Sequence, residues 1–239
     1  MTVVALGSAK GAPGVTTMAL ALAAGWPANR ALMVVEADPD GGVLAARRDL
    51  SPEPGLVTLA AALRRDRGTL TPHRQALGEG VHALCAPVAA AQVRAALAVG
   101  GDGLSSALAA AQDDVLIDCG RLTVTSPAAA LARDADTVLI LLRPRLDEVL
   151  VVRERVAALR ADGVEVALLL LRDGPYPAGE VAEATDAPVA AEVPLDRRAA
   201  EALGHAGVRL SPRSPLLRSA RHIAATLVAR PPGRPVGTP

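Results

Sequence analysis

The chain has 239 residues, of which 51% are hydrophobic and 21% are charged, so its composition is that of a globular protein and excludes an intrinsically disordered one. The 25 lysine and arginine residues balance the 25 aspartate and glutamate residues, so the formal net charge is zero. Only Trp26 and Tyr176 are aromatic, which argues against an RNA-binding protein that stacks bases on aromatic side chains. The two cysteines, Cys85 and Cys119, form no CxxC motif, so a disulfide framework and a zinc or iron–sulfur site made of this chain alone are excluded.

Short apolar runs alternate with longer alanine-rich stretches, a pattern that predicts strands alternating with helices. We expect strands at residues 3–6, 31–36, 81–85, 114–118, 137–142, 164–171 and 189–193. We expect helices at residues 16–24, 56–65, 89–99, 104–111, 127–133, 146–161, 178–185, 197–203 and 215–229. The strands are apolar on both faces, which is typical of a parallel sheet covered by helices on both sides. The pattern therefore predicts a doubly wound α/β fold with a mostly parallel sheet of seven or eight strands.

The alternation continues from the first strand to the last helix without a linker or an internal repeat. We therefore expect residues 1–230 to form a single domain. Residues 231–239 hold four prolines and two glycines and predict a disordered tail. The N-terminus lacks the basic start and long apolar run of a signal peptide, and the apolar runs are too short to span a bilayer, so we expect a cytoplasmic protein.

A glycine-rich turn at residues 7–17 joins the first strand to the first helix. Such a turn directs backbone N–H groups and the positive end of a helix toward an anion, and it is the usual cradle for phosphate. The Thr16 hydroxyl stands where it can meet a magnesium ion. The turn also holds Lys10, the one lysine among 25 basic residues.

This turn resembles the deviant Walker A motif of the MinD/ParA ATPases, K-G-G-x-G-K-[ST]-[ST]. Lys10 matches the signature lysine of that family, which in relatives crosses the dimer interface to the partner's nucleotide. The other matching positions are Gly11, Gly14, Thr16 and Thr17. Two positions depart from the motif: Ala12 replaces the second glycine, and Val15 replaces the lysine that holds the β- and γ-phosphates. Pro13 occupies the variable position and contributes no N–H.

Two further segments resemble motifs of the same family. Residues 34–42, VVEADPDGG, are similar to its second strand, where D-x-D-P-Q-G follows an apolar run; Asp38 matches the carboxylate near the attacking water and magnesium, and Glu36 stands where the family has aspartate. Residues 114–120, DVLIDCG, resemble a Walker B strand, with Asp118 as the carboxylate that acts on magnesium through bound water.

The resemblance extends over about residues 2–227. Residues 135–144 are similar to the strand after Walker B, and Pro194 and Asp196 match the P-x-D that lies beside adenine in relatives. Residues 171–173, Leu-Arg-Asp, stand where relatives carry an adenine-recognising asparagine. For Arg143 and Arg145, two roles stay open: neutralising phosphate in place of the missing lysine, or an ion pair with Asp147 or Glu148.

The resemblance implies a homodimer that binds ATP or ADP with magnesium and positions a cellular machine, such as a pilus or secretion system, a septum or a chromosome. It assigns catalytic roles to Lys10 and Asp38 and metal binding to Thr16, Asp38 and Asp118. It assigns nucleotide binding to Lys10, Gly11, Ala12, Pro13, Gly14, Val15, Thr16, Thr17, Pro194 and Asp196. Since Val15 removes a charge-assisted hydrogen bond worth about 1.5–3 kcal/mol, hydrolysis is expected to be weak or absent. The altered Walker A motif is similar to that of the pilus-localising TadZ/CpaE-like branch, whose protein partner would be a pilus or secretion ATPase.

Two alternatives remain at this point: a ParA-type partitioning ATPase that binds DNA nonspecifically, and a nucleotide-free pseudo-ATPase scaffold. The DNA-binding alternative is favoured by an uneven distribution of charge, which is typical of a chain with an anionic partner. Residues 202–239 carry six arginines and no acidic residue, for a net charge of +6, while residues 1–201 have a net charge of −6. The helix predicted at 215–229 has an apolar stripe, which we expect to pack on the sheet instead of anchoring a membrane. The stripe is formed by Leu216, Ala220, Ile223, Ala224 and Leu227.

Overall fold

The computed structural model describes residues 1–10, 13–65 and 68–229. In chain order, the elements are β1 (Val3–Ser8), α1 (Val15–Gly25), β2 (Leu32–Glu36), α2 (Leu44–Arg48), α3 (Leu56–Leu63), the 3₁₀ turn η1 (Thr71–His73), β3 (Gln75–Gly78), β4 (Val81–Leu84), α4 (Ala90–Ala109), β5 (Asp114–Arg121), α5 (Ala129–Arg133), β6 (Thr137–Leu142), α6 (Leu146–Ala161), β7 (Val166–Leu171), α7 (Ala178–Thr185), β8 (Val189–Val193), α8 (Arg197–Gly204) and α9 (Pro215–Val228). The tail predicted at 231–239 lies outside the described residues.

All eight strands form one sheet with the order β3-β4-β2-β5-β1-β6-β7-β8. Every neighbouring pair is parallel except β3 and β4. The parallel strands therefore end at the same edge of the sheet, and β1 lies near its centre between β5 and β6. This arrangement confirms the predicted doubly wound, mostly parallel sheet and fixes the number of strands at eight in the described part of the chain.

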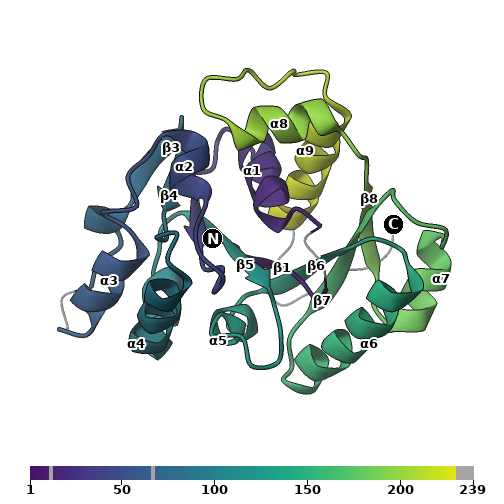
Figure 1. Cartoon of the computed structure of the whole chain (residues 1–239), viewed down its shortest axis with the longest axis horizontal. Helices are drawn as coiled ribbons and strands as arrows, with labels where there is room; N and C mark the ends of the chain where they lie inside the picture. Colours follow the sequence, from purple (N-terminus) through teal and green to yellow (C-terminus); the bar gives the residue numbers. More distant parts are fainter. Residues whose placement is uncertain (11–12, 66–67, 230–239) are drawn as a thin grey trace.

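Helices cover both faces of the sheet (Figure 1). Helices α1, α2, α8 and α9 lie on one face, and α3 to α7 lie on the other. Side chains of β1 alternate between the two cores, with Val3 and Ala5 on one side and Val4 and Leu6 on the other. This double burial is the reason why the strands are continuous apolar runs.

The apolar stripe of α9 faces the sheet, as expected, and each of its five residues is buried. Helix α9 also packs closely on α1, because a Cβ atom at Gly25 would lie 2.9 Å from the backbone nitrogen of Arg221. Among the described residues, no helix is both long and apolar enough to cross a bilayer.

The structure differs from the predicted elements most clearly at β3 and at the end of β5. The edge strand β3 was missed because its four residues, QALG, are only partly buried and include no β-branched or aromatic side chain. The helices predicted at 89–99 and 104–111 are the two parts of α4, which are separated at Gly101 by a non-helical kink (φ 39°, ψ −134°). In addition, β5 continues to Arg121, three residues past its predicted end, and this extension carries two residues into the site described next.

Candidate phosphate-binding site

A cavity of about 300 Å³ lies where β1, β2 and β5 end, at the edge where ligands bind in sheets of this kind. It gathers five of the residues singled out from the sequence: Gly14, Val15, Thr16, Thr17 and Asp38. Its remaining lining residues are Ser8, Asp40, Gly41, Val43, Arg47, Gly120 and Arg121. Residues from distant parts of the chain meet here because the parallel strands that carry them share one edge.

The turn between β1 and α1 presents a helix N-terminus to this cavity. Gly14 precedes α1 in the left-handed conformation (φ 93°, ψ 44°), which a residue with a side chain rarely adopts. Among the residues that the structure describes, no side chain caps α1, and its first turn holds no acidic residue. The leading N–H groups of α1 therefore remain available to an anion. Pro13 is buried just before this turn, and Gly11 and Ala12, both predicted to bind the cofactor, lie outside the described residues.

Asp118 lies in β5 behind Thr16 and is 1% exposed. Its Oδ1 atom accepts a hydrogen bond from the Gly120 N–H (3.1 Å), but its buried Oδ2 atom has no hydrogen-bond partner among the described residues. Burial raises the pKa of Asp118 to about 7, although the nearby Thr16 hydroxyl opposes this shift. A buried oxygen without a partner costs about 1–3 kcal/mol, so this atom is suited to receive a hydrogen bond from a magnesium-bound water.

The described residues hold no group of three His, Cys, Asp or Glu side chains placed to bind a metal ion. A magnesium ion at a nucleotide site is usually held by one or two protein oxygens together with phosphates and waters. Thr16 and Asp118 fit that type of site.

Asp38 reaches the cavity because the residue facing it is a glycine. Gly120 has a φ of +56°, and a Cβ atom there would lie 2.0 Å from the Cγ atom of Asp38. The Asp38 Oδ1 atom accepts a hydrogen bond from the Asp40 N–H (2.9 Å). Burial raises the pKa of Asp38, while the neighbouring Arg121 opposes the shift. Gly120 therefore provides the space in which the Asp38 carboxylate lies.

Glu36 is fully buried and fixes the segment that follows β2. Its Oε1 atom accepts hydrogen bonds from the N–H groups of Val43 (2.6 Å) and Leu44 (2.7 Å), and its Oε2 atom accepts one from Ala86 (2.9 Å). Burial raises the pKa of Glu36, and the three N–H groups oppose that rise. Glu36 does not line the cavity; it holds the start of α2 and the segment after β4 in place.

Two cations that we did not predict from the sequence line the cavity. The Nη1 atom of Arg47, from α2, donates a hydrogen bond to the Thr17 hydroxyl oxygen (3.3 Å). Arg121 lies at the end of β5, close enough to lower the pKa of Asp38. No sequence motif marks either arginine, because each reaches the cavity only through the placement of its element.

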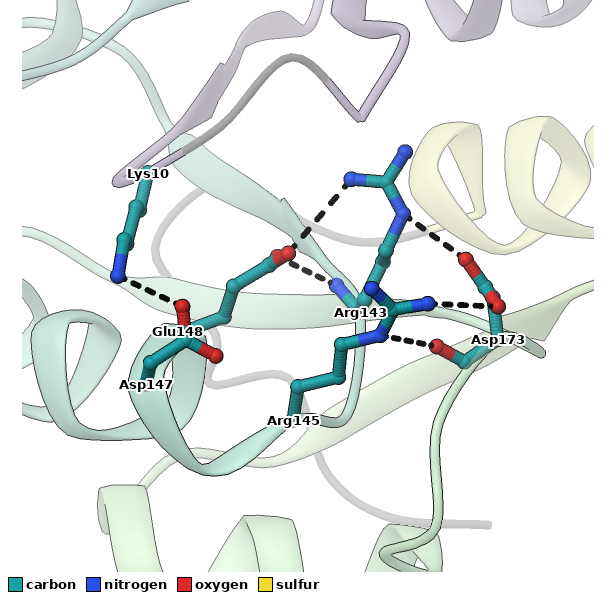
Figure 2. A network of polar contacts seen from close by, with 6 residues as sticks. All are labelled: Lys10, Arg143, Arg145, Asp147, Glu148 and Asp173. Atoms are coloured by element: carbon teal, nitrogen blue, oxygen red, sulfur yellow. Dashed lines mark hydrogen bonds and ion pairs between the residues drawn. The ribbon is translucent and has the colours of Figure 1, made fainter.

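Lys10 lies outside this cavity and pairs with α6 (Figure 2). Its Nζ atom is 2.6 Å from the Asp147 Oδ2 atom, and both side chains are exposed. This lysine lowers the pKa of the Asp147 carboxyl.

Arg143 and Arg145 form ion pairs, which was one of their two predicted roles, but their main partner is one we did not predict. Both contact Asp173, with N–O distances of 3.0 Å each (Figure 2). Arg143 also lies 3.6 Å from Glu148, whose other oxygen accepts the Arg143 backbone N–H. Asp147 pairs instead with Lys10.

Pro194 and Asp196, predicted to lie beside adenine, do not line the cavity. Asp196 caps α8 by accepting the Ala199 N–H (3.0 Å), and it also accepts a hydrogen bond from the Ser214 hydroxyl (2.7 Å) at the start of α9. The Ala199 N–H is the main cause of the lowered pKa of Asp196. In the structure this carboxylate joins two helices.

Comparisons with known proteins place this geometry in a known fold. No protein-family model matches the chain, and no curated protein sequence matches it. Among solved structures, a ParA family ATPase from Chlorobium tepidum TLS is similar with a TM-score of 0.76 and 16% identity, covering 94% of this chain and 97% of its own. The septum site-determining protein MinD from Pyrococcus horikoshii OT3, complexed with Mg-ADP, has a TM-score of 0.76 and 20% identity, covering 95% of each chain. A McdA variant from Cyanothece in complex with ATP has a TM-score of 0.72 and 17% identity, covering 96% of each chain.

These similarities span nearly the whole of both chains in each pair. The chain therefore has the MinD/ParA-like P-loop fold predicted from its glycine turn and strand motifs.

Proposed function

We propose that this chain binds ATP and ADP with magnesium in the 300 Å³ cavity and uses the bound nucleotide to control the positioning of a cellular machine, with weak or absent hydrolysis. The observation that carries the proposal is the buried Oδ2 atom of Asp118 near Thr16, which has no hydrogen-bond partner in the described part of the chain. It lies beside an uncapped helix N-terminus, and together these features favour a phosphate with an associated cation.

The roles of the residues follow from their places in the cavity. The leading N–H groups of α1 would bind phosphate oxygens, and Thr16 would hold magnesium directly with Asp118 acting through a bound water. When bound, magnesium would neutralise part of the negative charge of the phosphates. Asp38, held over Gly120, would orient the water that attacks the terminal phosphate.

Val15 is the reason to expect slow hydrolysis. Val15 lines the cavity at the first residue of α1, but it is buried in the apolar core and offers no charge to the phosphates. The lysine that relatives carry at this position stabilises negative charge as the transition state forms, so its absence lowers the rate of hydrolysis more than the affinity.

Lys10 connects the site to a proposed homodimer. Its exposure leaves it able to reach a second copy of the chain, and within the described residues its side chain pairs only with the exposed carboxylate of Asp147. Dimer formation on ATP would exchange this contact for one with the partner's nucleotide.

Isothermal titration calorimetry with Mg-ADP tests the nucleotide site. We expect measurable binding to the wild type and a loss of about tenfold or more in Thr16→Ala, with no change in Thr226→Ala, which removes an exposed hydroxyl on α9. An absence of heat with millimolar Mg-ADP and Mg-ATP would favour the nucleotide-free scaffold. Turnover of ATP at rates typical of relatives with an intact Walker A lysine would refute the proposal of weak hydrolysis.

Nonspecific DNA binding is a second candidate function, favoured by the region around α9. Four arginines there are exposed and form no ion pair among the described residues: Arg209, Arg213, Arg218 and Arg221. A gel shift that weakens steeply as salt rises would support this function, and unchanged DNA mobility at low salt would exclude it.

The machine that is positioned is proposed from the altered Walker A motif. Its resemblance to the pilus-localising branch favours a pilus or secretion ATPase as partner, with septum and chromosome factors as the alternatives. Affinity purification from the native cell tests this proposal, and recovery of a division or partition factor in place of a secretion ATPase would refute the pilus assignment.

A further inference from the structure

We propose that Arg47 provides the phosphate-binding cation that Val15 does not, so that in this chain the positive charge comes from α2 instead of from the glycine turn. The inference rests on the proposed nucleotide site and adds a binding residue to it. Two departures from the family motif are then related: Val15 removes the lysine of the glycine turn, and Glu36 holds the helix that carries the replacing arginine.

Arg47 lies on the same cavity as Val15 and the first turn of α1. Its side chain is half-buried, and its Nη1 atom contacts the Thr17 hydroxyl oxygen at 3.3 Å, near the upper limit for a hydrogen bond. Thr17 follows Thr16 directly in the first turn of α1, so the guanidinium is next to the N–H groups that would bind phosphate.

The guanidinium of Arg47 has no carboxylate partner in the part of the chain that the structure describes. The acidic residues on the same cavity are engaged elsewhere, since Asp40 pairs with Arg94 (2.8 Å) and Asp38 accepts the Asp40 N–H. A guanidinium carries five N–H donors, and here one of them makes a single long bond to a neutral oxygen. The remaining donors can meet the oxygens of a phosphate, which suit the planar guanidinium better than a lone hydroxyl does.

Glu36 explains why Arg47 lies at this position. Helix α2 has five residues, too few to be stable alone, and its N-terminal N–H groups at Val43 and Leu44 are held by the buried Glu36 carboxylate. Leu44 is buried in the core beneath, so the helix is fixed at its start and Arg47 extends from its last turn. Glu36 is thus a positioning residue for Arg47.

An independent observation also points to a ligand in this cavity. The buried Oδ2 atom of Asp118 has no hydrogen-bond partner among the described residues, and this side chain lies next to Thr16, which lines the cavity, although Asp118 itself does not. The cavity therefore combines a guanidinium that lacks a carboxylate partner among the described residues with the N-terminus of α1, and the buried Asp118 oxygen lies behind its wall at Thr16. A magnesium complex of a diphosphate satisfies all three groups.

The test measures binding of a fluorescent N-methylanthraniloyl ADP with magnesium, and its displacement by inorganic pyrophosphate. Arg47→Ala should weaken the binding of both ligands by about ten- to a hundredfold, the range for loss of a charge-assisted hydrogen bond. The matched control is Arg48→Ala, since Arg48 is the next residue of α2 and lines a separate cavity beside Trp26. Val15→Lys in the Arg47→Ala background should recover most of the lost affinity.

The outcomes separate the inference from the proposed function. If the wild type binds neither ligand, the nucleotide site fails and the role of Arg47 fails with it. If the wild type binds and Arg47→Ala binds equally well, or loses affinity for the nucleotide but not for pyrophosphate, the inference alone is wrong. Thermal unfolding of each variant checks that it is folded, and Arg47→Gln, which keeps a polar side chain of similar length, replaces Arg47→Ala if the alanine variant does not fold.

Discussion

Gly120→Ala gives the sharpest test of the site geometry, because the structure shows what the new methyl group would meet. The Cβ atom would lie 2.0 Å from the Asp38 Cγ atom and 2.2 Å from its Oδ2 atom. The variant would also place a residue with a side chain at a φ of +56°. Two costs therefore add: backbone strain, and displacement of the Asp38 carboxylate.

The magnitudes can be separated with a matched control. Gly163 follows α6 with a φ of +79°, and a Cβ atom there meets nothing within 4 Å, so Gly163→Ala measures backbone strain alone, about 1–2 kcal/mol. At Gly120 the displaced Asp38 also loses its hydrogen bond to the Asp40 N–H. For an exposed bond to a charged group this adds about 1.5 kcal/mol, so the melting temperature of Gly120→Ala should lie roughly 3–6 °C below that of Gly163→Ala.

Differential scanning calorimetry without nucleotide measures these shifts, and a double-mutant cycle with Asp38→Ala identifies the clash. In the Asp38→Ala background, Gly120→Ala should cost no more than Gly163→Ala does, since the carboxylate is gone. Equal melting temperatures for the two glycine variants in the wild-type background would show that Asp38 does not lie over Gly120, and the described geometry of the site would be wrong.

Three further predictions concern other parts of the structure. Burial raises the pKa of Asp118 to about 7, so the unfolded chain releases this proton at lower pH than the folded chain does. Without magnesium, the melting temperature of the wild type should therefore fall relative to that of Asp118→Asn as the pH rises from about 4 to 7. A difference in melting temperature that stays constant over this range would contradict the prediction. The buried Asp114 carboxylate accepts hydrogen bonds from the Trp26 ring, the Arg30 guanidinium and the Thr2 N–H, so Asp114→Asn should lower the free energy of unfolding by about 2–4 kcal/mol. Urea unfolding followed by the fluorescence of the single tryptophan measures this loss, and an unchanged urea midpoint would contradict it. Asp147→Asn removes the exposed ion pair with Lys10, so the melting temperature should stay unchanged. Because Lys10 is then free to reach a second copy, ATP-dependent dimers should form at lower protein concentration, as measured by analytical ultracentrifugation. A dimerisation midpoint equal to that of the wild type would show that the contact with Asp147 does not compete with dimer formation.

The sequence by itself was sufficient for the fold class and for the residues nearest the glycine turn. Parallel strands buried on both faces must be apolar runs, so β6, which is buried along its whole length, has the bounds that we predicted. The edge strand β8 also has its predicted bounds, although only Val193 in it is buried. The turn before α1 is recognisable because glycine is needed at a φ of 93°, and Asp38 and Asp118 follow apolar runs that end at the same edge of the sheet. These features are local in sequence, and local patterns can therefore reveal them.

Tertiary structure alone decided which charged groups meet. Asp173 pairs with Arg143 across 30 residues of sequence, Lys10 pairs with Asp147 across 137, and Arg47 reaches Thr17 across 30. Asp196 joins α8 to α9, because Ser214 is brought within 2.7 Å of it, and the family motif does not encode this contact. The partners of long polar side chains depend on how the helices pack on the sheet. That packing results from the burial of many apolar residues throughout the chain, and no short sequence motif encodes it.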